Sequence, residues 1–153
     1  PICCFFIIGF PEDDYRSVFK TYVAIIRCGL IGFTNVNLNA YSPQPNTESF
    51  RDLQEKGVIK DFDDRYLMSL FTFQDFGAKK TSYNSRFGDM ELSLMVTFGV
   101  ALFYIIYFLR KPQRIFQLLS DFSQNSSSNK STKMAKSFFK DAFKIVKNKF
   151  SRA

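Results

Sequence analysis

The longest uninterrupted apolar stretch of the chain runs from Leu92 to Leu109. These eighteen residues carry no charged side chain, and Arg110 and Lys111 follow them directly. As a helix they would span about 27 Å, close to the thickness of the hydrocarbon core of a bilayer. A buried helix of a soluble protein usually keeps a polar stripe, whereas this stretch has only scattered hydroxyl groups. The pattern favours a membrane helix over residues 92–109, with a buried core helix as the alternative.

A second, weaker apolar stretch covers residues 17–41. Arg27 lies inside it, and Asn35, Asn37 and Asn39 follow near its end. A central arginine costs about 2.5–3.5 kcal/mol on insertion scales, less when its side chain reaches the interface. We expect a first membrane helix here if Arg27 faces other helices. An amphipathic helix lying on the membrane surface is the alternative.

Charge is distributed unevenly around these two stretches. The segment 42–91 holds seven basic and nine acidic residues, a net charge of −2, and residues 110–153 hold eleven basic and two acidic ones, a net charge of +9. Basic residues mark the cytoplasmic side of a membrane protein. The expected fold class is therefore an all-α membrane protein with two transmembrane helices plus cytoplasmic amphipathic helices. Its predicted parts are a cytoplasmic N-terminal segment (1–16), a first membrane helix (17–41), an extracellular loop (42–91), a second membrane helix (92–109) and a cytoplasmic basic helical region (110–153).

The predicted cytoplasmic region ends in an amphipathic segment, residues 133–150. Lys136, Lys140, Lys144 and Lys147 recur at helical spacing, and phenylalanines occupy the opposite side. This pattern predicts a helix whose lysines contact anionic lipid at a membrane surface. Packing on neighbours within a larger membrane protein and binding to nucleic acid are the alternatives.

The composition indicates that many apolar side chains are surrounded by lipid or by a large protein core. The chain of 153 residues has 20 Phe, no Trp and no His, and its net charge is +7. Phenylalanine has no polar group, so twenty of them need a large core or a lipid phase. The positive charge suggests an anionic partner, and we expect the lipid bilayer rather than nucleic acid.

The residues that usually carry enzyme chemistry are missing from the sequence. Without histidine there is no Ser-His-Asp triad, and no Gly-rich phosphate loop or GxSxG motif occurs. Asp61, Asp63 and Asp64 lack the spacing of a calcium loop. Cys3, Cys4 and Cys28 are expected to be reduced, buried thiols. The sequence predicts no catalytic residue, no metal site, no cofactor and no enzymatic activity of this chain alone.

Four short elements resemble the N-terminal part of insect odorant receptors. They are the Gly-aromatic-Pro element Gly9–Pro11, the acidic, Leu-rich lead Asp89–Leu92, the basic pair Arg110–Lys111 and the apolar helix pattern of residues 115–122. The region from 42 to 86 departs from that pattern, because the first outer loop of the family is usually shorter. The resemblance covers the first two membrane spans of the family only.

The resemblance implies an odorant-gated cation channel subunit of olfactory signal transduction, a multi-pass protein of the plasma membrane that forms a hetero-oligomer with a co-receptor subunit. This chain would be an N-terminal fragment, since the family's pore lies in a last span that it lacks. The family's odorant pocket would place Met95 and Phe98 against a small volatile hydrophobic ligand. The alternatives are an accessory membrane subunit of a multi-subunit complex, such as an organellar respiratory complex, and a soluble basic helical protein that binds lipid or nucleic acid.

Overall fold

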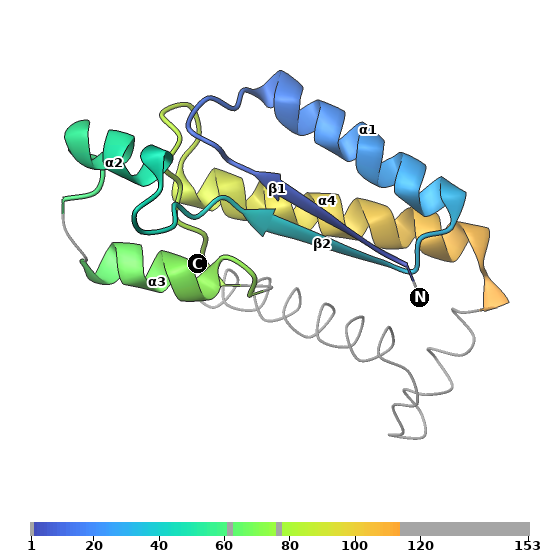
Figure 1. Cartoon of the computed structure of the whole chain (residues 1–153). Helices are drawn as coiled ribbons and strands as arrows, with labels where there is room; N and C mark the ends of the chain where they lie inside the picture. Colours follow the sequence, from blue (N-terminus) through green and yellow to red (C-terminus); the bar gives the residue numbers. More distant parts are fainter. Residues whose placement is uncertain (1, 61–62, 76–77, 114–153) are drawn as a thin grey trace, which may run out of the picture.

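The described part of the chain is a mixed α/β structure, not an all-α one. A computed structural model describes residues 2–60, 63–75 and 78–113, and within them two parallel strands pack against long helices (Figure 1). The expected all-α fold class is therefore wrong. In chain order the elements are β1 (Cys3–Ile8), α1 (Tyr15–Ile31), β2 (Asn35–Ala40), α2 (Glu48–Glu55), α3 (Asp64–Thr72) and α4 (Asp89–Arg110).

The first predicted membrane helix, 17–41, is wrong because a turn and a strand interrupt it. Helix α1 ends at Ile31, where Gly32 adopts a φ of 114° and its amide donates to the carbonyl of Cys28 over 3.1 Å. Glycine takes this left-handed conformation without a steric cost. The next residues alternate asparagine with Val36, Leu38 and Ala40, which is the period of a half-buried strand.

The predicted N-terminal segment 1–16 is also structured, because it contains β1 and the start of α1. Asp14 caps this helix: its carboxylate accepts from the amide of Ser17 over 2.7 Å, and the Ser17 hydroxyl accepts from the amide of Asp14 over 3.2 Å. This reciprocal pair is a capping box, which fixes where a helix begins.

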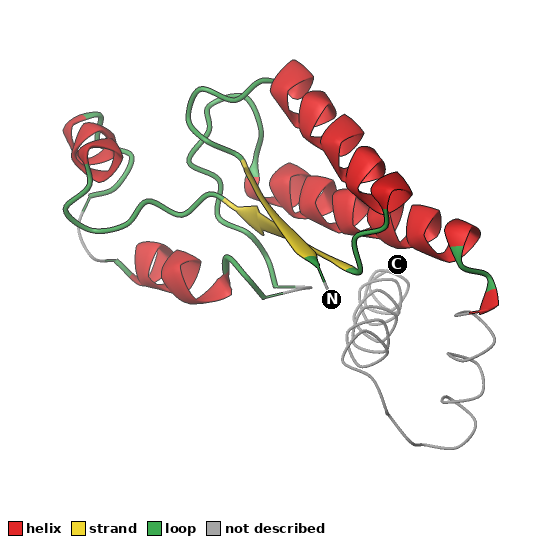
Figure 2. Cartoon of the chain, turned by 45° about the vertical axis from the view of Figure 1, so that its right-hand side comes forward, coloured by secondary structure: helices red, strands yellow, loops and turns green. Residues whose placement is uncertain are grey.

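Within the described residues, the sheet has two strands, and helices cover one of its faces. β1 and β2 pair in parallel, with Cys3 opposite Asn35 and Ile8 opposite Ala40. Helices α1 and α4 both lie on the same face of this sheet (Figure 2). The side chains of Ile8, Ile25, Leu92 and Phe103 are 1% exposed or less, and they form the centre of the core between the two layers.

Helix α4 packs closely because glycine stands at its contact with the sheet. A Cβ atom on Gly99 would lie 2.4 Å from Leu38 of β2 and 3.0 Å from the ring of Tyr22 of α1. Seven residues of α4 are buried in this contact, among them Val96 and Tyr107. The predicted helix of 92–109 is thus a helix that packs along one side on protein.

Among the described residues, α4 is the one helix that is long and apolar enough to cross a membrane. Core helices pass the same test of length and composition, so the structure holds one candidate span where two were expected. The second predicted membrane helix, 92–109, stays a prediction.

The predicted loop 42–91 holds α2, α3 and the first residues of α4. Its helices lie beyond the carboxyl ends of the strands (Figure 1) and enclose a second, smaller core. That core consists of Phe50, Leu53, Ile59, Tyr66 and Tyr83. Nearly all of the predicted basic region, including the segment 133–150, lies outside the described residues.

Candidate functional site

The uncovered face of the sheet is the most unusual surface of the described structure. On β1 it presents Phe5 and Ile7, which are 68% and 51% exposed. On β2 it presents Asn37 and Asn39, which stand opposite Phe5 and Ile7 in the strand register. Parallel sheets are ordinarily covered on both faces. We call these four residues the open face.

The two strands of the open face have different patterns. β1 reads Cys-Cys-Phe-Phe-Ile-Ile, a continuous apolar run that is typical of a strand buried on both sides. β2 alternates, so the amides of Asn37 and Asn39 share a face with the exposed Phe5 and Ile7. Ligand sites commonly combine large apolar contacts with a few polar groups that orient the ligand. The open face has this composition.

The turn that follows β1 is closed by its own carboxylate. One oxygen of Asp13 accepts from the amides of Gly9 and Phe10 over 2.8 and 3.0 Å. The other oxygen accepts from the hydroxyl of Ser17 over 2.8 Å. Backbone amides at the start of a helix often bind phosphate. Here they already bind an acid, so this turn does not offer a free phosphate site.

Asn84 holds the same turn against the segment that precedes α4. Its side-chain amide donates to the carbonyls of Phe10 and Asp13 over 2.6 and 2.9 Å, and more weakly to that of Pro11 over 3.3 Å. Its carbonyl oxygen accepts from the amide of Arg86 over 2.7 Å. Because 71 residues separate Asn84 from Asp13, this contact joins distant parts of the chain at the carboxyl edge of the sheet.

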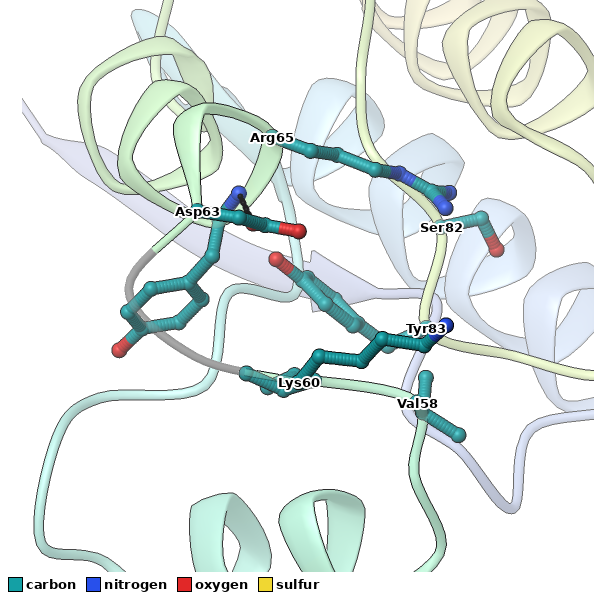
Figure 3. A pocket seen from close by; sticks show the side chains of 8 residues that line it. Val58, Lys60, Asp63, Arg65, Ser82 and Tyr83 are labelled. Carbon is teal, nitrogen blue, oxygen red and sulfur yellow. Dashed lines mark hydrogen bonds between the residues drawn. The ribbon is translucent and has the colours of Figure 1, made fainter.

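A cavity of about 240 Å³ lies between the start of α3 and the segment before α4. Asp63 and Arg65 line it from the start of α3, Lys60 from the preceding segment, and Ser82 and Tyr83 from the segment before α4 (Figure 3). Most of its charged groups already have partners. Asp63 accepts from the amide of Tyr66 over 2.7 Å, and Arg65 donates to Asp89 over 3.0 Å. We interpret it as a structural cavity.

Asp89 connects the start of α4 to this region. Its carboxylate accepts from the amide of Ser82 over 2.9 Å and lies 3.6 Å from the ammonium group of Lys79. Burial acts to raise the pKa of Asp89, but the Ser82 amide and the Arg65 guanidinium outweigh it and hold the pKa below its usual value. A lasting negative charge at this position also suits the N-terminus of α4.

Lys80 is buried, with 3% of its surface exposed. Its ammonium group donates to the carbonyl of Thr72, the last residue of α3, over 2.7 Å and to that of Asp75, which follows the helix. Burial lowers the pKa of Lys80 to about 8, which is a property of some catalytic lysines. The hydrogen bonds to carbonyls at the end of a helix identify it instead as a cap of α3.

The structure does not bring the predicted ligand-binding residues into one pocket. Met95 packs against the core, and its carbonyl accepts from the hydroxyl of Tyr22 over 2.9 Å. Phe98 points outward, is 56% exposed, and contacts the ring of Tyr22 at a centroid distance of 5.3 Å. Neither side chain lines the cavity between α3 and the segment before α4. The predicted membrane-surface lysines Lys136, Lys140, Lys144 and Lys147 lie outside the described residues.

The expectation of three buried thiols is wrong for two of the cysteines, because only one of the three is buried. Cys4 is buried, while Cys3 and Cys28 are half-buried. Burial and the neighbouring Cys28 raise the pKa of the Cys4 thiol to about 12, so it is a poor nucleophile. Within residues 2–60, 63–75 and 78–113, no group of three or more acidic, cysteine or histidine residues could hold a metal ion.

Sequence reasoning missed the open face because it assigned β2 to a membrane helix. The signal for it was present in the strict alternation of asparagine with apolar residues from Asn35 to Ala40. No family model matches the chain. A search of curated proteins finds no relative, and a search of solved structures finds no similar fold.

Proposed function

We propose that residues 2–113 form one sector of a larger parallel α/β domain, and that the open face contributes to a binding site for a small molecule inside that domain. The observation that carries this proposal is that α1 and α4 cover the same face of a parallel strand pair. In (β/α) barrels the helices surround the sheet on one side, and the side chains of the other side fill the interior.

The edges of the sheet support the same interpretation. The amide of Tyr41 donates to the carbonyl of Ile8 over 2.8 Å, so Ile8 directs its backbone toward β2. The backbone groups of Phe5 and Ile7 alternate with it and point away from β2. A long apolar strand with such an edge is a template for pairing with another strand. Further βα units would supply that strand.

The open face indicates the chemistry of the ligand. Phe5 and Ile7 offer apolar contact, and the amides of Asn37 and Asn39 can both donate and accept hydrogen bonds. A small molecule with an apolar or aromatic face and a neutral hydrogen-bonding edge fits this combination. In parallel α/β domains such ligands lie at the carboxyl ends of the strands, which is where Ile7 and Asn39 stand.

The test is to express the product of the complete natural reading frame and to follow hydrogen exchange at the amides of Phe5 and Ile7. The proposal expects additional βα units in that product and slow exchange at both amides, because a neighbouring strand binds them. If the reading frame encodes this chain alone, and both amides exchange as fast as those of an exposed loop, the sector proposal is wrong.

The two functions expected from the sequence, an odorant-gated channel subunit and an accessory membrane subunit, stay predictions. Both were based on an architecture of membrane helices, and the geometry of the sheet gives that architecture no support. That the chain lacks enzymatic activity of its own also stays a prediction, since the sector proposal leaves catalysis to the remainder of the domain.

A further inference from the structure

Helices α1 and α4 carry a continuous apolar surface on the side that faces away from the sheet. On α4 it consists of Leu94, Phe98, Ile105 and Leu109, whose spacing of four and seven residues places them on one side of the helix. On α1 it includes Phe19 and Leu30. We call these six residues the outer face.

The two helices bring these residues side by side because they run in the same direction and touch along their length. The hydroxyl of Tyr15 donates to Glu91 over 2.7 Å at one end. The ring of Tyr22 contacts Phe98 in the middle, and the guanidinium of Arg110 donates to the carbonyl of Leu30 at the other end. Apolar surface extended over two helices marks an interaction site.

Basic side chains accompany the outer face. Helix α1 has three exposed basic residues, Arg16, Lys20 and Arg27, and no acidic residue anywhere between Tyr15 and Ile31. Helix α4 has no acidic residue after Glu91 and ends at Arg110. An apolar surface bordered by cations is the pattern of a helix that lies in the interface of an anionic bilayer.

We propose that the outer face binds an anionic lipid bilayer, with α1 and α4 lying in the plane of the membrane. A crossing by α4 in the observed packing is unfavourable, because it would place in hydrocarbon the outer edges of β1 and β2, which pair with no other strand among the described residues. Parallel adsorption keeps the sheet in water. This proposal concerns the surface opposite the open face and does not depend on the proposed function.

Charge also argues against two other occupants of the outer face. A second copy of the chain would bring Arg16, Lys20 and Arg27 close to the same residues of its partner. The chain's own segment 133–150 would bring further lysines next to them. Both contacts place like charges together, whereas phosphatidylserine headgroups supply the opposite charge.

The experiment exploits the absence of tryptophan from the chain. In the full chain, Phe98→Trp places a single fluorescent probe on the outer face, and Phe5→Trp places a matched probe on the opposite layer. Both proteins are mixed with vesicles of phosphatidylcholine, with or without phosphatidylserine, that carry brominated acyl chains. We expect the probe at 98 to shift to shorter wavelength and to be quenched only with phosphatidylserine, and the probe at 5 to be unchanged.

A second pair of variants measures the affinity. Leu94→Ser combined with Phe98→Ser is expected to lower partition into anionic vesicles about tenfold or more, because the variant loses two apolar side chains that would be buried in the bilayer. Phe71→Ser, at a residue of α3 that is 75% exposed, is expected to leave partition nearly unchanged. Circular dichroism checks that every variant remains folded.

Three results would overturn the proposal. The first is binding to vesicles while the probe at 98 stays unquenched, which would assign adsorption to another part of the chain. The second is a probe already shielded without lipid in a concentration-dependent way, which would identify a second copy as the occupant. The third is shielding that does not depend on concentration, which would identify the chain's own C-terminal segment.

Discussion

At the scale of single residues, Gly99 decides how closely α4 approaches the sheet. A Cβ atom there would lie 2.4 Å from Leu38, whereas one on Gly88 at the start of the same helix would meet nothing within 4 Å. We expect Gly99→Leu to lower the free energy of unfolding by about 1–3 kcal/mol, because the side chain must push α4 away from β2. Urea denaturation measures the loss.

Gly88→Ala is the control for that change, since it adds a side chain at the residue that caps α4, where space is open. Its free energy of unfolding should stay within about 1 kcal/mol of the parent chain. Equal losses in the two variants would show that the close approach of α4 to β2 is not what Gly99 provides.

The carboxylate of Asp89 gives a prediction about pH. Its pKa is held below the usual value in the folded chain, so its contribution to stability is present above about pH 4 and is lost as the pH falls through the folded pKa. We expect Asp89→Asn to lower the free energy of unfolding at pH 7 by about 1–3 kcal/mol. The difference from the parent chain should shrink toward pH 3 in urea titrations. A difference that is constant with pH would show that the charge of Asp89 is not what stabilises the fold.

At the scale of elements, one side chain joins the turn between β1 and α1 to the segment before α4. Asn84→Leu removes the donor from the carbonyls of Phe10, Pro11 and Asp13. We expect a loss of about 1–3 kcal/mol and faster hydrogen exchange within this turn. Ser85→Ala, at the exposed neighbouring residue, should change neither quantity.

Sequence patterns identified some elements and not others for a physical reason. The helix at 92–109 follows from eighteen consecutive residues without a charge, and it exists as part of α4. The two strands were not predicted. β1 is six apolar residues that do not alternate with polar ones, and β2 closely follows an apolar helix, so both were assigned to other elements. Whether a helix is covered by lipid or by a sheet leaves no clear mark on hydropathy. The alternation of asparagine with apolar residues in β2 was the available signal for the open face, and the apolar stretch before it hid that signal.

At the scale of the whole molecule, the open face predicts self-association of the isolated chain. Phe5 and Ile7 are exposed on a strand whose outer edge pairs with no other strand of the described structure. Lysine at these positions discourages pairing between edges. We expect Phe5→Lys combined with Ile7→Lys to shift the chain from concentration-dependent oligomers to a monomer in sedimentation velocity. Phe71→Lys, on α3, should leave the oligomers in place, and a monomeric parent chain would contradict the prediction.

The carboxylate of Asp13 on the amides of Gly9 and Phe10 has a consequence for the choice of compounds in a ligand screen. An acid tethered three or four residues away competes as an internal counter-ion at a very high effective concentration. A nucleotide or sugar phosphate therefore gains little from its charge at this turn. Libraries of uncharged metabolites should give hits as often as their phosphorylated counterparts.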